Sequence, residues 1–384
     1  MKAWSARRSA VALLVIYAWL TGLIGGKANR LVRRLLVTST GGLGDGVLVA
    51  SLIQHLRECN PELEVGVLAR FGARAALTTL PNVRVHDYEL RGGRWSAWFA
   101  LSRELRAARY DAALATDHTS LSTAALLCLA RIGRRAGFDP LCDSPQARLY
   151  TDSIRLDEGA SQWQSLVHLA RLIDAGLAPA LDVLPLAIPA HLDAGVARWW
   201  NETVGNGEGP AVALHPGSGV HTYKRWPVSR FVQLAEKIRA TAPRAIMLLS
   251  GRAEERELLA EFARNYTGRA LDLTSITSIQ ETAAVLRRCD LLISNDGGIM
   301  HLGATMGVPT VGLFGPASPR QWAPRGRRAT FVQGKNLPCR PCIRSYRGAP
   351  PARCTNPISS QCMMEISVDD VIAAARRVAG PWLA

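Results

Sequence analysis

The sequence predicts an α/β protein with two doubly wound domains, each built around a parallel sheet. From Arg34 onward, short β-branched runs alternate with longer segments of helical periodicity, which is the signature of parallel strands joined by crossover helices. The same rhythm restarts after a polar, glycine-rich stretch at 206–210. The 384 residues also exceed what one hydrophobic core usually serves. We therefore expect two α/β halves that face a central cleft.

The elements of the first half follow directly from these runs. Strands are expected at 35–39, 64–68, 83–85 and 111–115. Helical patterns occupy 47–57, 94–108, 120–132 and 160–175. We place this N-terminal domain at 35–206.

The second half repeats the alternation. Strands are expected at 211–214, 245–249, 291–294 and 310–314. Helical patterns occupy 228–240, 255–266, 279–288 and 298–306. We place the C-terminal domain at 207–384, with a Cys-rich segment at 339–362.

Residues 1–34 precede the first domain as a separate basic and apolar segment. The run from Ser9 to Gly26 carries no charge and has basic residues on both sides. Its length is at the lower limit for a bilayer span. A membrane anchor or interfacial helix, a signal-like segment and a packed helix all fit this pattern. We expect the segment to associate with a membrane.

The formal net charge of +15 is concentrated in two stretches. Residues 1–40 contain seven basic side chains and no acid, and residues 320–353 contain nine and no acid. The rest of the chain is therefore close to neutral, which argues against a positively charged coat for nucleic acid. We expect local partners for the two basic stretches, with a membrane surface as one of them, and no nucleic-acid partner.

The first glycine-rich loop, 40–46, joins a predicted strand to a helix. Its glycines let the backbone approach a ligand closely, and a helix N-terminus favours negative charge on that ligand. Their spacing does not match the dinucleotide-binding fingerprint. Asp45, at the start of the helix, is either a helix cap or a catalytic base.

The second loop runs from His215 to Gly219 and is followed by Lys224 and Arg225 just before a helix. Small residues with nearby cations are typical of an anion site, because backbone amides and a mobile ammonium group can both face a phosphate. A solvated surface loop is the alternative.

The third loop, 294–298, ends a strand and begins a helix. Gly297 and Gly298 leave amides unobstructed at the helix N-terminus, and Asp296 can accept hydrogen bonds from sugar hydroxyls. His301, one turn into the helix, either packs internally or faces the ligand. All three loops lie at the carboxyl ends of parallel strands, where open α/β sheets bind ligands.

In this order and spacing, the motifs resemble those of glycosyltransferase family 9, the ADP-heptose:lipopolysaccharide heptosyltransferases. The resemblance extends from Leu35 to Val378 and is carried by 42–45, by 215–227 and by 295–301. It implies a GT-B fold of two Rossmann-like domains, in which the C-terminal domain holds most of the donor. It also implies an inverting, metal-independent transfer.

The resemblance assigns roles to individual residues. Asp45 corresponds to the general base that takes the proton of the acceptor hydroxyl. Lys224 and Ser218 match positions that contact the diphosphate, where a cation offsets the charge on the leaving group. Asp296 matches a residue that binds the donor sugar. The remaining expected donor contacts are Gly297, Gly298 and His301.

Three further assignments come from the resemblance. Glu255 falls where the family has an acid for the nucleotide ribose, with Glu254 as a near-equal candidate, and Arg135 is assigned to the acceptor. The four clustered cysteines resemble the family's Cys-rich region with stretched spacing: Cys339, Cys342, Cys354 and Cys362. They suit a structural Zn or Fe ion, a reduced packing cluster or one disulfide. No cofactor is expected for catalysis.

These features predict a glycosyltransferase that moves heptose from ADP-heptose to a lipopolysaccharide core or related glycan. We expect it at the cytoplasmic face of the inner membrane or in the cytosol. A nucleotide-sugar epimerase of GT-B fold and a transferase using another nucleotide sugar are the enzyme alternatives. A membrane-tethered nucleic-acid-binding module is the non-enzymatic one, although interleaved aromatic residues are missing from the sequence.

Overall fold

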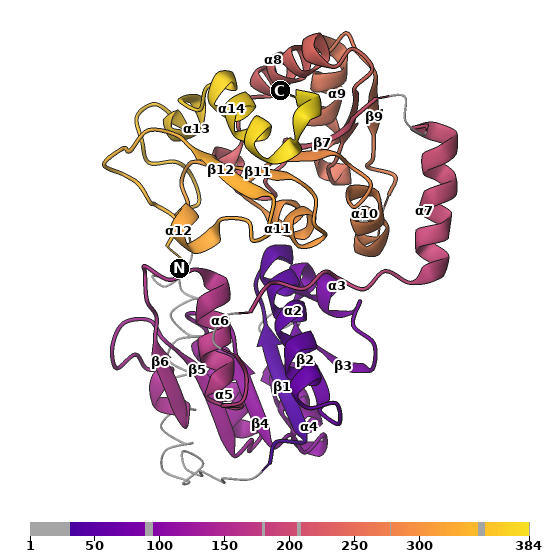
Figure 1. Cartoon of the computed structure of the whole chain (residues 1–384). Coiled ribbons are helices and arrows are strands. Elements are labelled where there is room, and N and C mark those ends of the chain that lie inside the picture. The colour runs from indigo at the N-terminus through magenta and orange to yellow at the C-terminus, as the bar shows by residue number, and fades with distance from the viewer. Residues whose placement is uncertain are drawn as a thin grey trace. The chain divides into compact units, whose positions relative to one another are not determined.

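A computed structural model describes residues 31–88, 95–178, 181–205, 209–276, 278–344 and 350–383. The described residues fall into two compact units that divide between Leu181 and Asp182. Each unit contains one parallel six-stranded sheet flanked by helices (Figure 1). The prediction of two doubly wound α/β halves is therefore confirmed.

The sheet of the first unit has the strand order β3-β2-β1-β4-β5-β6, and every pair is parallel. Its strands are β1 (Arg34–Ser39), β2 (Glu64–Ala69), β3 (Val83–Asp87), β4 (Ala112–Ala115), β5 (Arg134–Asp139) and β6 (Asp152–Arg155). Its helices are α2 (Leu43–Cys59), α3 (Phe71–Leu77), α4 (Trp95–Ala107), α5 (Leu121–Leu129) and α6 (Gln162–Arg171). The winding direction reverses between β1 and β4, which makes their carboxyl ends the switch point of the sheet.

The central strands of this unit are buried on both faces, as expected for a parallel sheet between two helix layers. Leu36, Ala113 and Ala115 pack against α4 and α5 on one face. On the other face, α2 contacts α3 and α6. Gly46 allows the close approach of α2 and α3, because a Cβ atom there would lie 2.5 Å from the Ala73 carbonyl oxygen.

The second unit repeats the topology, with the strand order β12-β11-β10-β7-β8-β9. Its strands are β7 (Ala211–His215), β8 (Ile246–Leu249), β9 (Ala270–Asp272), β10 (Leu291–Asn295), β11 (Thr310–Phe314) and β12 (Ala329–Gln333). Its helices are α7 (Ala190–Thr203), α8 (Val228–Thr241), α9 (Arg256–Asn265), α10 (Ile279–Leu286), α11 (Gly298–Thr305), α12 (Pro319–Trp322), α13 (Gln361–Met364) and α14 (Val368–Ala379). Here the switch point lies between β7 and β10.

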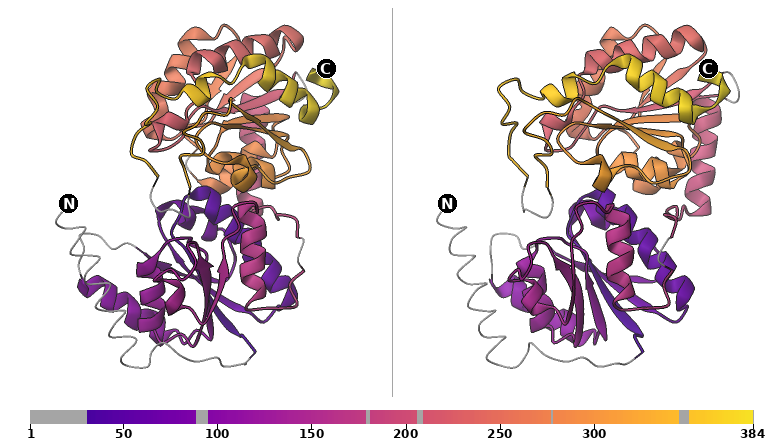
Figure 2. Two further views of the ribbon diagram at one scale, coloured as in Figure 1. Left: turned by 90° about the vertical axis from the view of Figure 1, so that its left-hand side faces the viewer. Right: turned by 60° about the vertical axis from the view of Figure 1, so that its left-hand side comes forward.

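The main core of the second unit lies under α8, α9 and α14. Trp226 and Phe231 are fully buried in it and meet edge to face, with 4.9 Å between ring centroids. The indole N–H of Trp226 donates to the Ile366 carbonyl. Figure 2 shows α14 lying along the sheet, where it contacts β10, β11 and β12.

The division between the units lies earlier in the chain than the predicted boundary at 206–207. Helix α7 belongs to the second unit because it packs on α10. Asp193 of α7 forms ion pairs with Arg287 and Arg288, at 2.8 and 2.7 Å. The predicted boundary therefore does not coincide with the division between the units.

None of the described helices combines the length and apolar character that a membrane crossing requires. The predicted segment from Ser9 to Gly26 lies outside the described residues.

Candidate active site

The loop after β1 places Asp45 at the third position of helix α2. The carboxylate of Asp45 accepts a hydrogen bond from the Gly42 amide at 2.9 Å, and the side chain is only partly buried. A Cβ atom on Gly41 would lie 2.4 Å from the same carboxylate oxygen, so a larger residue there would displace the Asp45 side chain. Asp45 is thus a helix cap, and its partial exposure leaves it accessible for chemistry.

A second carboxylate, which the sequence analysis did not single out, holds this loop at its base. Asp117 follows β4 and accepts hydrogen bonds from the Thr40 amide at 2.8 Å and from the hydroxyls of Thr40 and Thr38. Burial raises the pKa of Asp117, while these three bonds oppose the rise. Strands β1 and β4 are neighbours at the switch point, so Asp117 fixes the start of the loop that carries Asp45.

In the second unit, Lys224 and Asp296 form a nearly buried ion pair. Their charged atoms lie 2.6 Å apart, and their side chains are 14% and 8% exposed. Lys224 lies in the loop after β7, and Asp296 directly follows β10. Gly297 and Gly298 then begin α11, whose first amide groups have no acceptors within the helix. This arrangement joins a cation to a helix N-terminus at the switch point, as an anion site requires.

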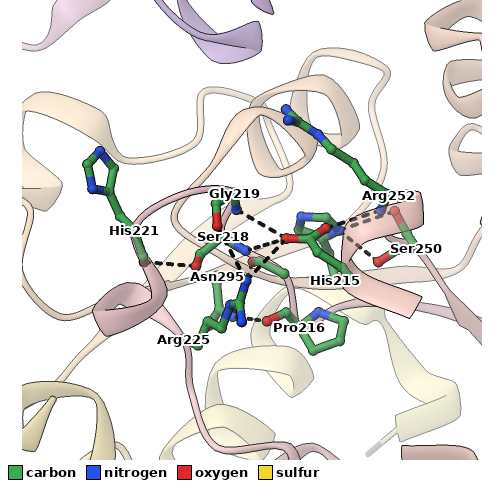
Figure 3. A network of polar contacts seen from close by, with 11 residues as sticks. His215, Pro216, Ser218, Gly219, His221, Arg225, Ser250, Arg252 and Asn295 are labelled. Carbon is green, nitrogen blue, oxygen red and sulfur yellow. Dashed lines mark hydrogen bonds and ion pairs between the residues drawn. The ribbon is translucent and has the colours of Figure 1, made fainter. Parts of the chain in front are cut away.

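The loop after β7 is folded around the carboxylate of Glu255. One oxygen of Glu255 accepts hydrogen bonds from the amides of Ser218 and Gly219, at 3.0 and 3.1 Å, and the other accepts one from Arg252 (Figure 3). Burial alone would raise the pKa of Glu255, but nearby His215 and these amide bonds outweigh it, and the pKa lies below its usual value. Glu254 is exposed and Glu255 is buried, so Glu255 is the glutamate that holds this loop by hydrogen bonds.

Asn295 fastens the same loop to the end of β10. Its side chain accepts a hydrogen bond from the Trp226 amide at 3.0 Å and donates one to the Pro216 carbonyl at 2.8 Å (Figure 3). The Ser218 hydroxyl is engaged within the loop, where it donates to the His221 carbonyl. Asn295 was not predicted as a site residue. Its position at the end of a predicted strand, next to Asp296, could have indicated it.

The comparisons with known proteins identify the family. A model of glycosyltransferase family 9 (heptosyltransferase) matches residues 98–351, more than half of the chain. The chain belongs to glycosyltransferase family 9. It is therefore an enzyme, a transferase, as predicted.

Relatives and solved structures agree with this assignment. Lipooligosaccharide heptosyltransferase 2 of Haemophilus influenzae is 24% identical over 314 residues, which cover 78% of this chain and 88% of the relative. ADP-heptose lipopolysaccharide heptosyltransferase II of E. coli superposes with a TM-score of 0.69 at 22% identity, over 90% of this chain and 98% of that one. The family 9 glycosyl transferase of Veillonella parvula gives 0.72 at 21% identity, over 90% and 97%. The fold of this family 9 enzyme is GT-B.

His301 lies inside the second unit of the glycosyltransferase. It is 4% exposed, its Nδ1 atom has no hydrogen-bond partner among the described residues, and its ring meets Trp322 edge to face at 6.3 Å. Burial lowers its pKa to about 4, with Asp296 and Lys224 close enough to act on it in opposite directions. His301 is therefore a neutral, packed histidine beside the ion pair.

Acid is expected to destabilise the second unit through His301. The unfolded chain takes up this proton near pH 6.5, whereas the native chain takes it up only near pH 4. The free energy of unfolding should therefore fall as the pH drops between these values, by at most roughly 1.4 kcal/mol per pH unit. Urea unfolding at a series of pH values measures this slope. His301→Gln should reduce it and exposed His191→Gln should not; equal slopes in all three proteins would contradict the assignment.

Arg135, which was predicted to bind the acceptor, lies in the interior of the first unit. The side chain is 2% exposed, and its guanidinium donates to the carbonyls of Leu149 and Ile132. Its third nitrogen, Nη2, is buried and has no hydrogen-bond partner among the described residues, so an acceptor could reach Arg135 only after a local rearrangement. The geometry therefore favours a structural role in the first unit.

None of the four clustered cysteines forms a disulfide in the structure. Burial raises the pKa of Cys362 to about 11, and burial with neighbouring Cys339 raises that of Cys342. Cys354 accepts a hydrogen bond from the Ser360 amide at 3.5 Å. Across the described residues, no three His, Cys, Asp or Glu side chains form a ready-made metal site. The thiols are neighbours without being arranged as ligands.

Proposed function

We propose that this glycosyltransferase moves heptose from ADP-heptose to a lipopolysaccharide core or related glycan acceptor. The observation that carries the proposal is the ion pair of Lys224 and Asp296 at the N-terminus of α11. A diphosphate needs a cation and free amides, and a sugar needs a hydrogen-bond acceptor for its hydroxyls. The similar lipooligosaccharide and ADP-heptose lipopolysaccharide heptosyltransferases support the same donor and acceptor class.

The proposed step is a single displacement at the anomeric carbon. Asp45 takes the proton of an acceptor hydroxyl as the hydroxyl oxygen forms the new glycosidic bond. The bond from the anomeric carbon to the diphosphate oxygen breaks, and its electron pair leaves with ADP. Attack opposite the leaving group inverts the configuration.

The leaving group develops negative charge during this step. Lys224 and the first amides of α11, at Gly297 and Gly298, are suited to stabilise that charge. Asp296 orients the Lys224 ammonium group and is available for donor hydroxyls. With these groups in place, we expect the transfer to proceed without a metal ion.

A panel of nucleotide sugars tests the proposal. ADP-heptose should raise the melting temperature of the protein, and acceptor glycan should be required for its consumption. Stabilisation by UDP-sugars alone would favour a transferase with another donor. Consumption of the nucleotide sugar without acceptor would favour an epimerase.

We also propose that the enzyme acts at the cytoplasmic face of the inner membrane. The support is the basic charge concentrated in 1–40 and 320–353, which suits anionic lipid headgroups. Co-flotation with anionic vesicles, and its loss at high salt, is the expected result. Equal recovery with neutral vesicles would argue against an electrostatic membrane contact.

The four cysteines remain candidates for a structural metal, and Arg340 supports that proposal. Arg340 is 8% exposed, and its Nε and Nη2 atoms have no hydrogen-bond partner within the described residues. Burial lowers the pKa of Arg340, and the nearby Cys362, Cys339, Cys342 and Glu365 side chains oppose this shift when they are ionised. Four thiolates around Zn²⁺ carry a net negative charge, which would give this buried guanidinium its counter-charge. Because the thiols do not form a ready-made set, we expect their side chains to rearrange when the ion binds.

Metal titration tests this proposal. The chelator-treated, reduced protein should bind a single equivalent of Zn²⁺ and lose the reactivity of its clustered thiols. Cys342→Ser should abolish both effects, whereas Cys59→Ser, at an exposed cysteine of α2, should change neither. If Zn²⁺ protects no thiol and does not bind, the cysteines are packing residues only.

A further inference from the structure

A polar pocket of about 360 Å³ lies beside the edge strand β6 of the first unit. Its wall is formed by the end of β6, the following loop and helix α6. The polar side chains that line it are Arg155, Asp157, Gln164, Ser165 and His168. None of these residues belongs to the site described above.

The register of the sheet places this pocket at the same edge as the loop of Asp45. Thr38 of β1 is level with Ala115, Ala115 with Gly137, and Gly137 with Ser153 of β6. Arg155, two residues after Ser153, is therefore level with Thr40, where the loop of Asp45 begins. Three strand spacings separate them, which is about 14 Å across the sheet. A glycan of several sugar units can span that separation.

The pocket is richer in hydrogen-bond donors than in acceptors. The Arg155 guanidinium, the His168 ring and the Ser165 hydroxyl can all donate. The Gln164 carbonyl is already engaged by Ser161, which leaves its amide group as a donor. Asp157 is the one carboxylate in the lining, and it accepts a hydrogen bond from Gly159 in its own turn. This chemistry suits a ligand with several oxygen acceptors and a negative charge.

We propose that the pocket binds an anionic sugar unit of the acceptor, remote from the hydroxyl that receives the heptose. The identity of the acceptor rests on the proposed function. Arg155 pairs with the carboxylate or phosphate group of that unit, and the neighbouring donors bind its hydroxyls. Binding at a remote unit positions the reacting hydroxyl near Asp45.

Steady-state kinetics with a deacylated core oligosaccharide tests the proposal. Arg155→Ala should raise the acceptor KM roughly ten-fold, with the donor KM unchanged, because a charged hydrogen bond is lost. Arg155→Lys should recover only part of the affinity, since lysine cannot form a paired contact with a carboxylate or phosphate. Exposed Arg103→Ala in α4 is the matched control and should behave as wild type.

Two modified acceptors distinguish the sources of negative charge. If the ligand group is a phosphate, dephosphorylated acceptor should bind wild type and Arg155→Ala equally; if it is a carboxylate, carboxyl-reduced acceptor should do so. A full ten-fold difference with both modified acceptors would overturn the anionic assignment. An unchanged acceptor KM in Arg155→Ala would overturn the pocket itself while leaving heptose transfer intact.

A binding measurement that does not depend on heptose transfer tests the pocket independently of the proposed function. If wild-type protein transfers no heptose, calorimetric titration of the same oligosaccharide still reports on the pocket. Weaker binding by Arg155→Ala than by Arg103→Ala would then uphold the pocket. Equal binding would reject it.

Discussion

Replacing Asp45 by asparagine should lower kcat by roughly two to four orders of magnitude, the contribution of a positioned general base. The side-chain carbonyl of the introduced asparagine can still accept the hydrogen bond from Gly42, so helix α2 should keep its cap. We propose that the donor binds to the second unit, so donor affinity should be nearly unchanged. Single-turnover kinetics with saturating donor and acceptor gives the rate, and donor titration gives the affinity.

A second acidic cap provides the matched control for Asp45. Glu281 occupies the third position of α10 and accepts hydrogen bonds from the amide and hydroxyl of Ser278. Glu281→Gln removes a capping charge of the same kind, at a cost of about 1 kcal/mol or less, and should leave kcat unchanged. If Asp45→Asn retains wild-type turnover, Asp45 is only a cap and another base must take the proton.

Replacing Lys224 by methionine should impair both catalysis and folding. The leaving group loses its cation, so kcat should fall and the donor KM should rise. The Asp296 carboxylate remains buried without its partner, 2.6 Å away in the wild type, which typically costs about 3–5 kcal/mol of unfolding free energy. Donor kinetics and urea unfolding measure the two losses separately.

The double variant Lys224→Met/Asp296→Asn separates these losses. Neutralising Asp296 removes the unpaired buried charge, so much of the stability should return while the rate stays low. Lys237 forms an exposed ion pair with Asp369, and Lys237→Met should change stability by less than about 1 kcal/mol. Normal donor kinetics in Lys224→Met would remove Lys224 from the phosphate site.

The central strands and the three loops could be predicted because their sequences carry strong local signals. Strands β1, β7 and β10 each contain an uninterrupted apolar run of at least three residues, as expected for strands buried on both faces. Each is followed by glycine or small residues before a helix. Since parallel strands bring their carboxyl ends to one edge, the loops of each sheet meet at its switch point.

The edge strands β6 and β12, and β5 beside β6, could not be predicted from such signals. β6 reads Asp-Ser-Ile-Arg and is partly exposed throughout, and β12 likewise has no buried residue. β5 begins with two arginines, which look like surface residues until the structure pairs Arg135 with backbone carbonyls. These segments become strands because of contacts with residues far away in the sequence, and their local sequence pattern does not indicate a strand.

The positions of Asp117 and Glu255 within the site likewise depend on long-range contacts that the sequence does not reveal. Asp117 follows a short alanine-rich strand, and only the pairing of β1 with β4 brings it to Thr40. The sequence could not separate Glu255 from Glu254, because both lie in one turn. The structure shows that Glu255 is buried beneath the amides of Ser218 and Gly219, whereas Glu254 is exposed.

Product analysis by mass spectrometry and NMR tests the central claim most directly. Wild-type protein, ADP-heptose and a core oligosaccharide acceptor should yield ADP and an acceptor with one added heptose, linked with inverted anomeric configuration. The same mixture with Asp45→Asn should yield almost none of this product. Conversion of the nucleotide sugar with the acceptor unmodified, or transfer with retained configuration, would contradict the account.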